Sequence, residues 1–315
     1  MNRPGSAAEL LEAARLRLSA CGVDGARLDT EVLLAHAMGI DRGRLVLLLA
    51  GGRGLPPGGP IVEAQAASRF RAMVERRGSR EPLAYITGLR EFWSLELEVT
   101  LAVLIPRPET EILVQEALAA IPAGERTVVV DVGTGSGAVA LALAKERPSV
   151  FVVATDISET ALEVARRNVA RHDAGTRVRL ARCDLLSALL PRGARDGGEQ
   201  RGRRYFIVSN PPYVDLDERE TLMPEVRDHE PAQALYAGVR GMEIIERLVP
   251  QAEALLAPGE WLMMEVAAPR APEVTALLEG SRCWDEVGVR EDYAGLPRVV
   301  RARRSSAPSN EAEKR

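Results

Sequence analysis

A glycine-rich turn between an apolar strand and an apolar helix constrains this chain more than any other stretch. Residues 127–133, TVVVDVG, predict a buried strand, and residues 138–146, AVALALAKE, predict a helix. The turn that joins them carries Gly133, Thr134, Gly135, Ser136 and Gly137. Glycine lets the backbone turn tightly and lets a ligand approach the main chain, and the new helix offers free N–H groups there. The turn therefore predicts a site for a dinucleotide, a phosphate or an adenosine-bearing cofactor.

Strands and helices alternate from this turn to the C-terminus. Further strands are expected at residues 151–156, 178–184, 205–210, 259–266, 284–292 and 298–304, and helices at 158–173, with Ser158 as N-cap, 241–256 and 271–280. This alternation is typical of a doubly wound, Rossmann-like α/β fold with a mostly parallel sheet, here of seven strands. The last two strands follow each other with little chain between them, so one of them should be antiparallel.

The N-terminal part of the chain has a helical pattern instead. Helices are expected at residues 7–20, at 29–40 with Asp29 as N-cap, and at 61–79, with a Gly/Pro loop at 51–60 and a short hairpin within 92–105. We therefore predict a helical domain at 1–80, a hairpin or linker at 81–110, an α/β domain at 111–303 and a disordered tail at 304–315. The polar, glycine-rich residues 191–204 are interpreted as a flexible insertion.

Composition excludes several classes of protein. The net charge of −4 over 315 residues argues against a protein whose main partner is bulk nucleic acid. Cys21, Cys183 and Cys283 are far apart and show no CxxC spacing, which argues against a disulfide framework or a zinc site. The N-terminus has no apolar signal core, and no apolar run is long enough to span a bilayer. A cytoplasmic protein without bound metal is expected.

An acidic residue narrows the choice of ligand. Asp156 ends the strand after the glycine turn, where a carboxylate can accept hydrogen bonds from both hydroxyls of a ribose. The turn does not have the G-x-G-x-x-G spacing, and no Lys-Ser/Thr pair follows it as in a P-loop. An acid at this place would also serve NAD, so the residues alone indicate a ribose-bearing cofactor.

The stretch FIVSNPPYVD places Asn210, Pro211, Pro212 and Tyr213 at the carboxyl end of the fourth strand of the predicted sheet. Ligands bind at the carboxyl ends of strands in open α/β sheets, so these residues should share a crevice with the glycine turn. The side-chain oxygen of Asn210 and the carbonyl of Pro211 can accept two hydrogen bonds from a planar NH2 group, whose lone pair is otherwise delocalised. Proline fixes the direction of the carbonyls, and the Tyr213 ring can pack on a flat substrate. The stretch predicts a clamp for methylation of an amide or exocyclic amine nitrogen, without a general base or metal.

The glycine pattern, with Asp131 just before it, resembles the class I S-adenosylmethionine-dependent methyltransferases. In those enzymes an acid after a later strand flanks the adenine, and Asp184 matches that place. An N-cap role for Asp184 is the other interpretation. Leu185 stands where some members carry an aromatic residue, so packing on the adenine would be aliphatic. The Asn-Pro-Pro-aromatic motif occurs in enzymes that methylate adenine N6, guanine N2 or glutamine, and it does not by itself name the substrate.

Residues 81–114 resemble the release factor glutamine methyltransferases, the HemK/PrmC family. The residues that carry this resemblance are Pro82, Tyr85, Ile86, Gly88, Phe92, Trp93 and the Ile-Pro-Arg-Pro-Glu-Thr-Glu stretch at 105–111. Residues 225–245 and 292–300 also look like segments of that family. The resemblance extends over about residues 7–303, and the Arg-Pro-Glu-Thr-Glu part is its most specific piece.

The resemblance implies methyl transfer from S-adenosyl-L-methionine to the side-chain nitrogen (N5) of the glutamine in the Gly-Gly-Gln motif of peptide chain release factors, with S-adenosyl-L-homocysteine as product. It implies that the glycine turn, Asp156, Asp184, Leu185 and Asn210 contact the cofactor. Asn210–Tyr213 and Arg107 would contact the substrate, and the helical domain would bind the release factor. Alternatively, Arg107 and Glu111 pair with each other and only tie the domain joint together. A monomer without membrane or direct nucleic-acid partners is expected.

Three other functions stay open at this point. A glutamine methyltransferase acting on a ribosomal protein would share the same motif and a similar helical domain. A DNA adenine-N6 methyltransferase would need a target-recognition domain and a basic, aromatic surface, and the acidic balance of the chain argues against it. A regulatory module that binds the cofactor without catalysis would not need the intact Asn210–Tyr213 motif.

Overall fold

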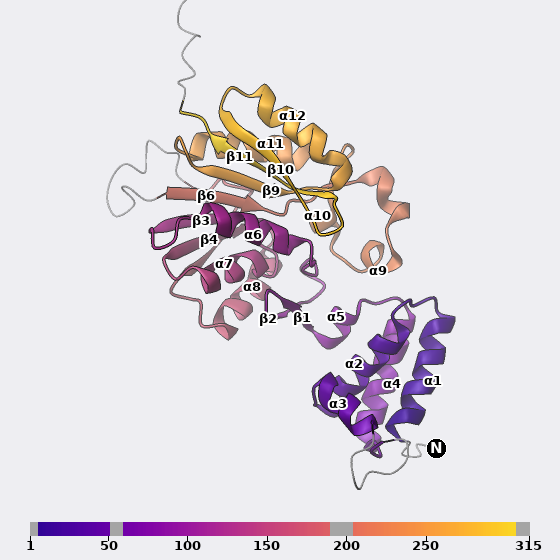
Figure 1. Ribbon diagram of the computed structural model, residues 1–315. Coiled ribbons are helices and arrows are strands. Elements are labelled where there is room, and N and C mark those ends of the chain that lie inside the picture. Colours follow the sequence, from indigo (N-terminus) through magenta and orange to yellow (C-terminus); the bar gives the residue numbers. More distant parts are fainter. Residues whose placement is uncertain (1–5, 51–58, 190–203, 307–315) are drawn as a thin grey trace, which may run out of the picture. The chain divides into compact units, whose positions relative to one another are not determined.

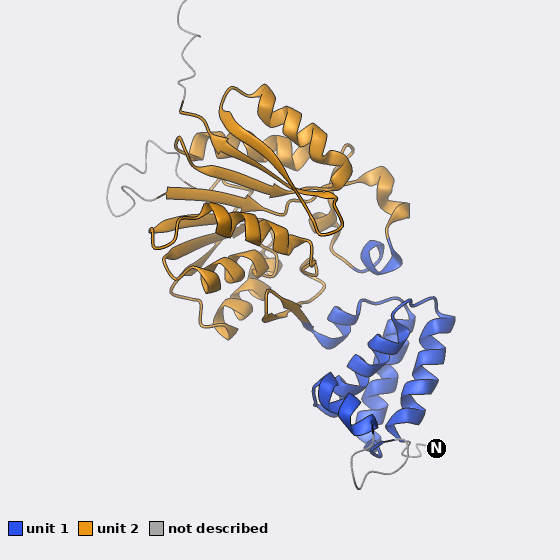
Figure 2. Ribbon diagram, viewed as in Figure 1, with its two compact units in different colours: residues 1–89, 223–229 blue, residues 90–222, 230–315 orange. Residues whose placement is uncertain are grey.

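The computed structural model describes residues 6–50, 59–189 and 204–306. The chain divides into two compact units, which Figure 2 colours separately. One comprises residues 1–89 and 223–229, and the other comprises residues 90–222 and 230–315. We call them the helical unit and the α/β unit.

The helical unit is built from amphipathic helices around a small apolar core. Its helices are α1 (Ala7–Ala20), α2 (Ala26–Met38), α3 (Arg42–Leu49), α4 (Ala64–Gly78), α5 (Leu83–Thr87) and α9 (Pro224–Arg227). Leu18, Leu33, Leu45 and Phe70 are buried at its centre. The helices expected at 7–20 and 61–79 are confirmed, whereas most of the predicted loop at 51–60 lies outside the described residues.

The predicted N-cap role of Asp29 is wrong. Helix α2 begins three residues earlier, with Gly25 as its N-cap, so Asp29 lies inside its first turn. The Asp29 side chain is buried and accepts a 2.7 Å hydrogen bond from Nε of Arg77 in α4. This ion pair between two helices is a tertiary interaction, which the local pattern around Asp29 does not contain.

The predicted joint at 81–110 is divided between the units. Helix α5 within it contributes Ile86 to the core of the helical unit, which therefore extends to Leu89. The expected hairpin is present as β1 (Leu89–Phe92) and β2 (Leu95–Glu98), a few residues earlier than the predicted range. Trp93 and Ser94 form its turn, both with positive φ.

The α/β unit contains a seven-stranded sheet among the residues that the structure describes (Figure 1). Its strands are β3 (Thr127–Val132), β4 (Val150–Asp156), β5 (Val178–Arg182), β6 (Arg204–Ser209), β9 (Trp261–Glu265), β10 (Trp284–Glu291) and β11 (Pro297–Arg304), in the order β10-β11-β9-β6-β3-β4-β5. Strand β11 runs antiparallel to both neighbours, and the other described pairs of the sheet are parallel. The predicted doubly wound sheet with one antiparallel strand is confirmed.

Helices cover both faces of this sheet (Figure 1). The face with α6 (Thr110–Ala120), α7 (Ala138–Glu146) and α8 (Glu159–Arg171) buries Val129 and Phe206, and the face with α11 (Glu243–Leu255) and α12 (Ala271–Gly280) buries their neighbours Val130 and Ile207. Two covered faces explain the continuous apolar runs of the central strands. The remaining short elements are β7 (Val214–Asp215), η3 (Leu216–Thr221), α10 (Ala232–Leu235), β8 (Tyr236–Gly238) and η4 (Ala268–Arg270).

The predicted tail begins too early. Arg304 is the last residue of β11, and the buried Ser305 donates its N–H to the carbonyl of Cys283 at 2.9 Å, so strand pairing orders both residues. Residues 307–315 and nearly all of the predicted insertion at 191–204 lie outside the described residues. Among the described helices, none combines the length and the apolarity that crossing a membrane requires.

Candidate functional site

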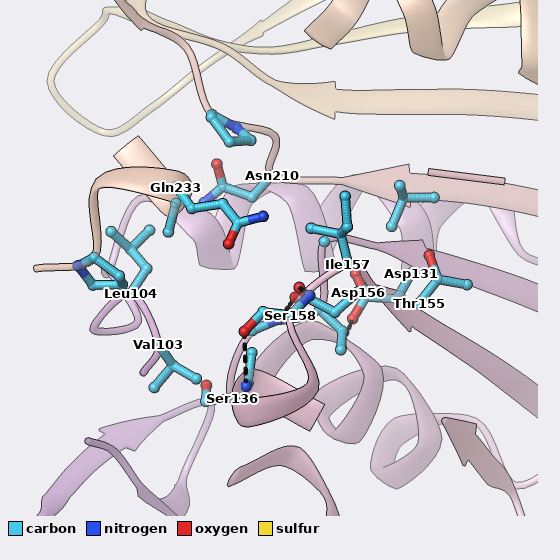
Figure 3. Close-up of a pocket in the computed structure, with 18 of the residues that line it drawn as sticks. Val103, Leu104, Asp131, Ser136, Thr155, Asp156, Ile157, Ser158, Asn210 and Gln233 are labelled. Carbon is cyan, nitrogen blue, oxygen red and sulfur yellow. Dashed lines mark hydrogen bonds between the residues drawn. The ribbon is translucent and has the colours of Figure 1, made fainter. Parts of the chain in front are cut away.

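A cavity of about 510 Å³ lies at the carboxyl ends of the parallel strands of the α/β unit. This volume is in the range of a small-molecule or cofactor site. Most of the residues predicted for the site line it: Arg107, Gly133, Thr134, Gly135, Ser136, Asp156, Asp184, Leu185, Asn210 and Pro212. Gly137, Pro211 and Tyr213 are not among the described residues that line it. Figure 3 shows Asp156, Ser158 and Asn210 in its wall.

Two carboxylates fix the glycine turn. Asp131 at the end of β3 accepts a 2.6 Å hydrogen bond from the hydroxyl of Thr134 and a 3.1 Å bond from the N–H of Ala140. Asp156 at the end of β4 accepts a 3.0 Å bond from the N–H of Gly135. Because Asp131 is buried, its pKa rises to about 6. The turn is therefore held in place from both sides.

Gly137 supplies a backbone conformation that residues with a side chain rarely adopt. It has a φ of 84° and is the N-cap residue of α7. A Cβ atom at this position would lie 3.5 Å from Cβ of Ala165 in α8. This is an ordinary van der Waals distance, so the space would admit a side chain, and it is the positive φ that favours glycine where the turn enters α7.

The geometry around Asp156 suits a ribose. Its Oδ1 accepts the N–H of Ser158 at 2.9 Å, and its Oδ2 accepts the N–H of Gly135. Each carboxylate oxygen has a second lone pair, which a hydroxyl group in the cavity can use. Burial raises the pKa of Asp156, although these N–H groups oppose the shift. Ser158 caps α8 as predicted, through a 3.2 Å bond from the N–H of Ala161.

Asp184 and Leu185 form the wall next to the end of β5. Residues 184–189 form turns instead of a helix, so the N-cap interpretation of Asp184 is wrong. Its carboxylate pairs with Arg247 of α11. Leu185 has a positive φ of 54°, and its carbonyl accepts a 3.0 Å hydrogen bond from the hydroxyl of Thr155. This bond holds an aliphatic side chain against the cavity, where the flat base of an adenosine can pack.

Asn210 directly follows β6, the fourth strand of the sheet along the chain. Its Nδ2 donates a 3.1 Å hydrogen bond to Oγ1 of Thr110, the first residue of α6. In this orientation its Oδ1 remains an acceptor. The hydroxyl of Tyr213 donates to Oε1 of Glu265, at the end of β9, over 3.4 Å. Thus Asn210 and Tyr213 each bind a side chain of another element, Thr110 of α6 and Glu265 of β9.

Arg107 has a different partner from the predicted one. Its guanidinium pairs with Glu230, which is buried and also accepts the N–H of Ile105. Glu111 instead accepts a 3.0 Å hydrogen bond from the N–H of Trp93 in the hairpin turn. The suggested pair between Arg107 and Glu111 is therefore wrong, because the partner of Arg107 lies far away in the sequence.

Several residues of the site were not found from the sequence. They are Thr110, Asn168, Glu230, Gln233 and Glu265. Thr110 lies within the Arg-Pro-Glu-Thr-Glu stretch, a pattern that by itself assigns no role to the threonine hydroxyl. Glu265 ends a strand next to that of Asn210, and a carboxylate at the carboxyl end of a central strand is a usable signal. For Gln233, an exposed residue of α10 that lines the cavity, no signal in the sequence stands out.

These residues fit S-adenosylmethionine. The glycine turn brings backbone close to the cavity, Asp156 offers acceptors to ribose hydroxyls, and Leu185 provides an apolar wall for an adenine. Asn210 lies in the same cavity, where a methyl acceptor could meet the donor.

Comparisons with known proteins agree with this geometry. Residues 9–88 match the PrmC N-terminal domain, and residues 108–226 match the methyltransferase small domain. The chain is 39% identical over 300 residues to the release factor glutamine methyltransferase of Koribacter versatilis, covering 95% of this chain and 99% of the relative. It is 40% identical over 295 residues to the enzyme of that name from Geobacter sulfurreducens, covering 94% and 95%.

Solved structures add evidence on the fold alone. The catalytic domain of hMettl16, in complex with MAT2A 3'UTR hairpin 6, matches with a TM-score of 0.52 at 13% identity and covers 85% of this chain and 92% of its own. The full-length similarity to the bacterial relatives is more specific. On this similarity, and with a site that fits the cofactor, the chain belongs to the family of release factor glutamine methyltransferases, which use S-adenosyl-L-methionine as methyl donor.

Proposed function

We propose that this protein methylates the side-chain amide nitrogen (N5) of the glutamine in the Gly-Gly-Gln motif of peptide chain release factors. The observation that carries the proposal is the orientation of Asn210. Its Nδ2 is bound to Thr110, so its Oδ1 is available as an acceptor in the cavity that also contains the glycine turn. An amide NH2 group is a substrate that such an acceptor recognises.

The residues of the cavity have separate tasks. When bound, S-adenosylmethionine supplies an electrophilic methyl group. Asp156, the glycine turn and Leu185 hold its adenosine part, as argued above. Oδ1 of Asn210 accepts one N–H of the glutamine amide, and the carbonyl of the next residue, Pro211, which does not itself line the cavity, accepts the other. The two acceptors orient the nitrogen and stabilise the positive charge that develops on it as the N–C bond forms, and the nitrogen then releases a proton to solvent.

The helical unit supplies the contact with the release factor in this proposal. Among its described residues, three leucines are exposed, Leu16, Leu28 and Leu47, with exposed fractions of 56%, 49% and 74%. Exposed apolar side chains of this kind can contact a protein partner. Leu47→Ser should raise the KM for the release factor and leave the affinity for S-adenosylmethionine unchanged.

In this proposal the protein works as a monomer in the cytoplasm, without direct contact to nucleic acid.

A methyl-transfer assay tests the function. The purified protein and labelled S-adenosylmethionine are mixed with a release factor, or with the same factor whose Gly-Gly-Gln glutamine is replaced. Label on the first factor alone is expected. If neither factor is labelled while the cofactor still binds, the release factor is not the substrate, and ribosomal proteins are tested next.

A further inference from the structure

The hydroxyl of Thr110 cannot by itself fix the orientation of the Asn210 amide. A threonine hydroxyl both donates and accepts, so it can bind either end of an amide. If it accepts from Nδ2, Oδ1 faces the cavity and can receive a substrate N–H. If it donates to Oδ1, the NH2 group of Asn210 faces the substrate NH2, and two donors oppose each other. A third group has to decide where the single proton of Thr110 points.

Glu265 is placed to be that group. It ends β9, which pairs with β6 up to Ser209 and Met264, so Glu265 and Asn210 extend adjacent strands of the sheet. The residue is only 1% exposed. Its Oε1 accepts the hydroxyl of Tyr213, and its Oε2 is buried with no hydrogen-bond partner within the described part of the chain. A buried carboxylate oxygen without a partner is costly, which calls for a donor in the working enzyme.

The groups around Glu265 leave Thr110 as its natural donor. The titratable or charged groups that act on it are Arg298 of β11, Glu109 at the start of α6 and Tyr213. Arg298 already binds Asp292 at 3.1 Å, and Glu109 is itself an acid. Burial raises the pKa of Glu265 to about 7, and the neighbouring Thr110 hydroxyl is the first group that opposes the rise, so Thr110 is the donor available to the unpartnered Oε2.

We infer that Glu265 is a positioning residue that sets the polarity of a hydrogen-bonded chain ending at the substrate amide. Charged Glu265 accepts the proton of Thr110, Thr110 therefore accepts from Nδ2 of Asn210, and Oδ1 of Asn210 faces the cavity. This inference rests on the proposed function for the identity of the substrate, although it holds for any methyl acceptor with an NH2 group. Glu265 itself touches neither substrate nor cofactor.

Protonation of Glu265 reverses the direction of the hydrogen bonds from Glu265 through Thr110 to Asn210. A neutral carboxyl group can donate a hydrogen bond to Thr110. The Thr110 hydroxyl can then donate its own proton to Oδ1 of Asn210, and the side-chain amide of Asn210 flips. The enzyme should therefore lose kcat as pH falls through the pKa of Glu265. The group that titrates is remote from the reacting atoms, so the binding of S-adenosylmethionine should not follow the same profile.

Four variants test the inference. Thr110→Val removes the hydroxyl at nearly constant shape and should lower kcat about 10-fold or more. Thr110→Ser retains the hydroxyl and should restore most of kcat. Glu265→Gln should lower kcat and abolish the acid limb of its pH profile. Thr275→Val is the matched control, because the Thr275 hydroxyl in α12 is also buried but has no partner among the described residues. Its kcat should equal that of the wild type.

A second readout does not depend on the reaction. In nuclear magnetic resonance spectra, the side-chain NH2 signals of Asn210 should shift with the titration of Glu265 in the wild type and stay constant in Glu265→Gln. An unchanged kcat in Thr110→Val, a retained acid limb in Glu265→Gln, or a Thr110→Ser variant as impaired as Thr110→Val would each overturn the inference. Failure of the proposed function shows itself differently, as absence of release factor methylation by the wild type at every pH.

Discussion

Asn168, fully buried in α8, donates a 2.9 Å hydrogen bond from Nδ2 to the carbonyl of Ser136 in the glycine turn. The same amide binds the backbone of Glu98 in β2 twice, accepting its N–H at 2.7 Å and donating to its carbonyl at 2.9 Å. One side chain thereby joins the hairpin to the cofactor turn. This contact was invisible in the sequence, where Asn168 is an ordinary helix residue.

Asn168→Leu should therefore destabilise the fold and weaken cofactor binding. It leaves a buried N–H and two carbonyls without their partner, which should cost about 2–4 kcal/mol of unfolding free energy. A looser turn should also reduce the affinity for S-adenosylhomocysteine about 10-fold. Urea unfolding and isothermal titration calorimetry measure the two effects. Arg166→Ala, at an exposed position of the same helix, should change neither by more than about 0.5 kcal/mol.

Asn210→Ala removes one of the two acceptors proposed for the substrate amide. By comparison with the loss of one donor from an oxyanion hole, kcat should fall by an amount equal to about 2–4 kcal/mol, with cofactor affinity retained. Steady-state kinetics on the release factor provide the test. Asn210→Asp keeps an acceptor and should be less impaired. A normal kcat for Asn210→Ala would contradict the hypothesis that Asn210 holds the substrate amide.

Asp156→Asn should weaken cofactor binding more than catalysis. The amide can still accept one N–H of the turn, although it loses negative charge and half of the acceptors offered to Gly135, Ser158 and the ribose. We expect a loss of affinity of about 1–2 kcal/mol for S-adenosylhomocysteine, measured by calorimetry, with kcat at saturating cofactor little changed. Equal affinity in the variant and the wild type would contradict a ribose role.

A double-mutant cycle separates a structural role of Arg107 from a role in binding substrate. Arg107→Met leaves the buried carboxyl of Glu230 without its cation and should cost about 2–3 kcal/mol of stability. Burial raises the pKa of Glu230, and Arg107 is the main group that opposes this shift. Adding Glu230→Gln should restore most of the stability. If the KM for release factor stays high in the stable double variant, Arg107 binds substrate; if it returns to normal, the role is structural.

Glu265 should make stability depend on pH in a defined direction. Its pKa is raised from 4.5 to about 7 in the folded protein, so the folded state binds the proton more tightly than the unfolded state. The stabilising effect is fully present below pH 4.5 and is lost as pH rises through 7. The unfolding free energy of the wild type, minus that of Glu265→Gln, should therefore fall by up to about 3 kcal/mol between pH 4.5 and 8. Asp131 also titrates in this window but is common to both proteins and cancels.

The opposite slope would mean that Glu265 is stabilised as an anion in the folded protein. Chemical denaturation at several pH values measures the difference. A variant that is more stable than the wild type at pH 8 yet less active would be the signature of a carboxylate kept charged for catalysis.

The amino-acid sequence by itself determined most of the secondary structure of the α/β unit and the class of its sheet. The strands of the sheet, the helix after the glycine turn, the Ser158 cap and the presence of one antiparallel strand at the C-terminus follow from patterns within a few consecutive residues. Apolar periodicity, glycine at a turn and a hydroxyl before a helix act locally, so they can be interpreted without knowing the fold. The glycine turn, Asp156 and Asn210 could also be placed together, because the carboxyl ends of parallel strands meet at one edge.

Only the tertiary structure decided which polar groups are partners. Asn210 with Thr110, Arg107 with Glu230, and Asp29 with Arg77 are separated by 100, 123 and 48 positions in the chain. No local periodicity encodes such pairs, because they depend on how helices and strands pack and on which groups lose water together. The same holds for Glu265, which looked like the end of an apolar strand. Glu265 is buried next to Thr110 and Tyr213 only in the folded chain, and only there can its charge orient the Thr110 hydroxyl.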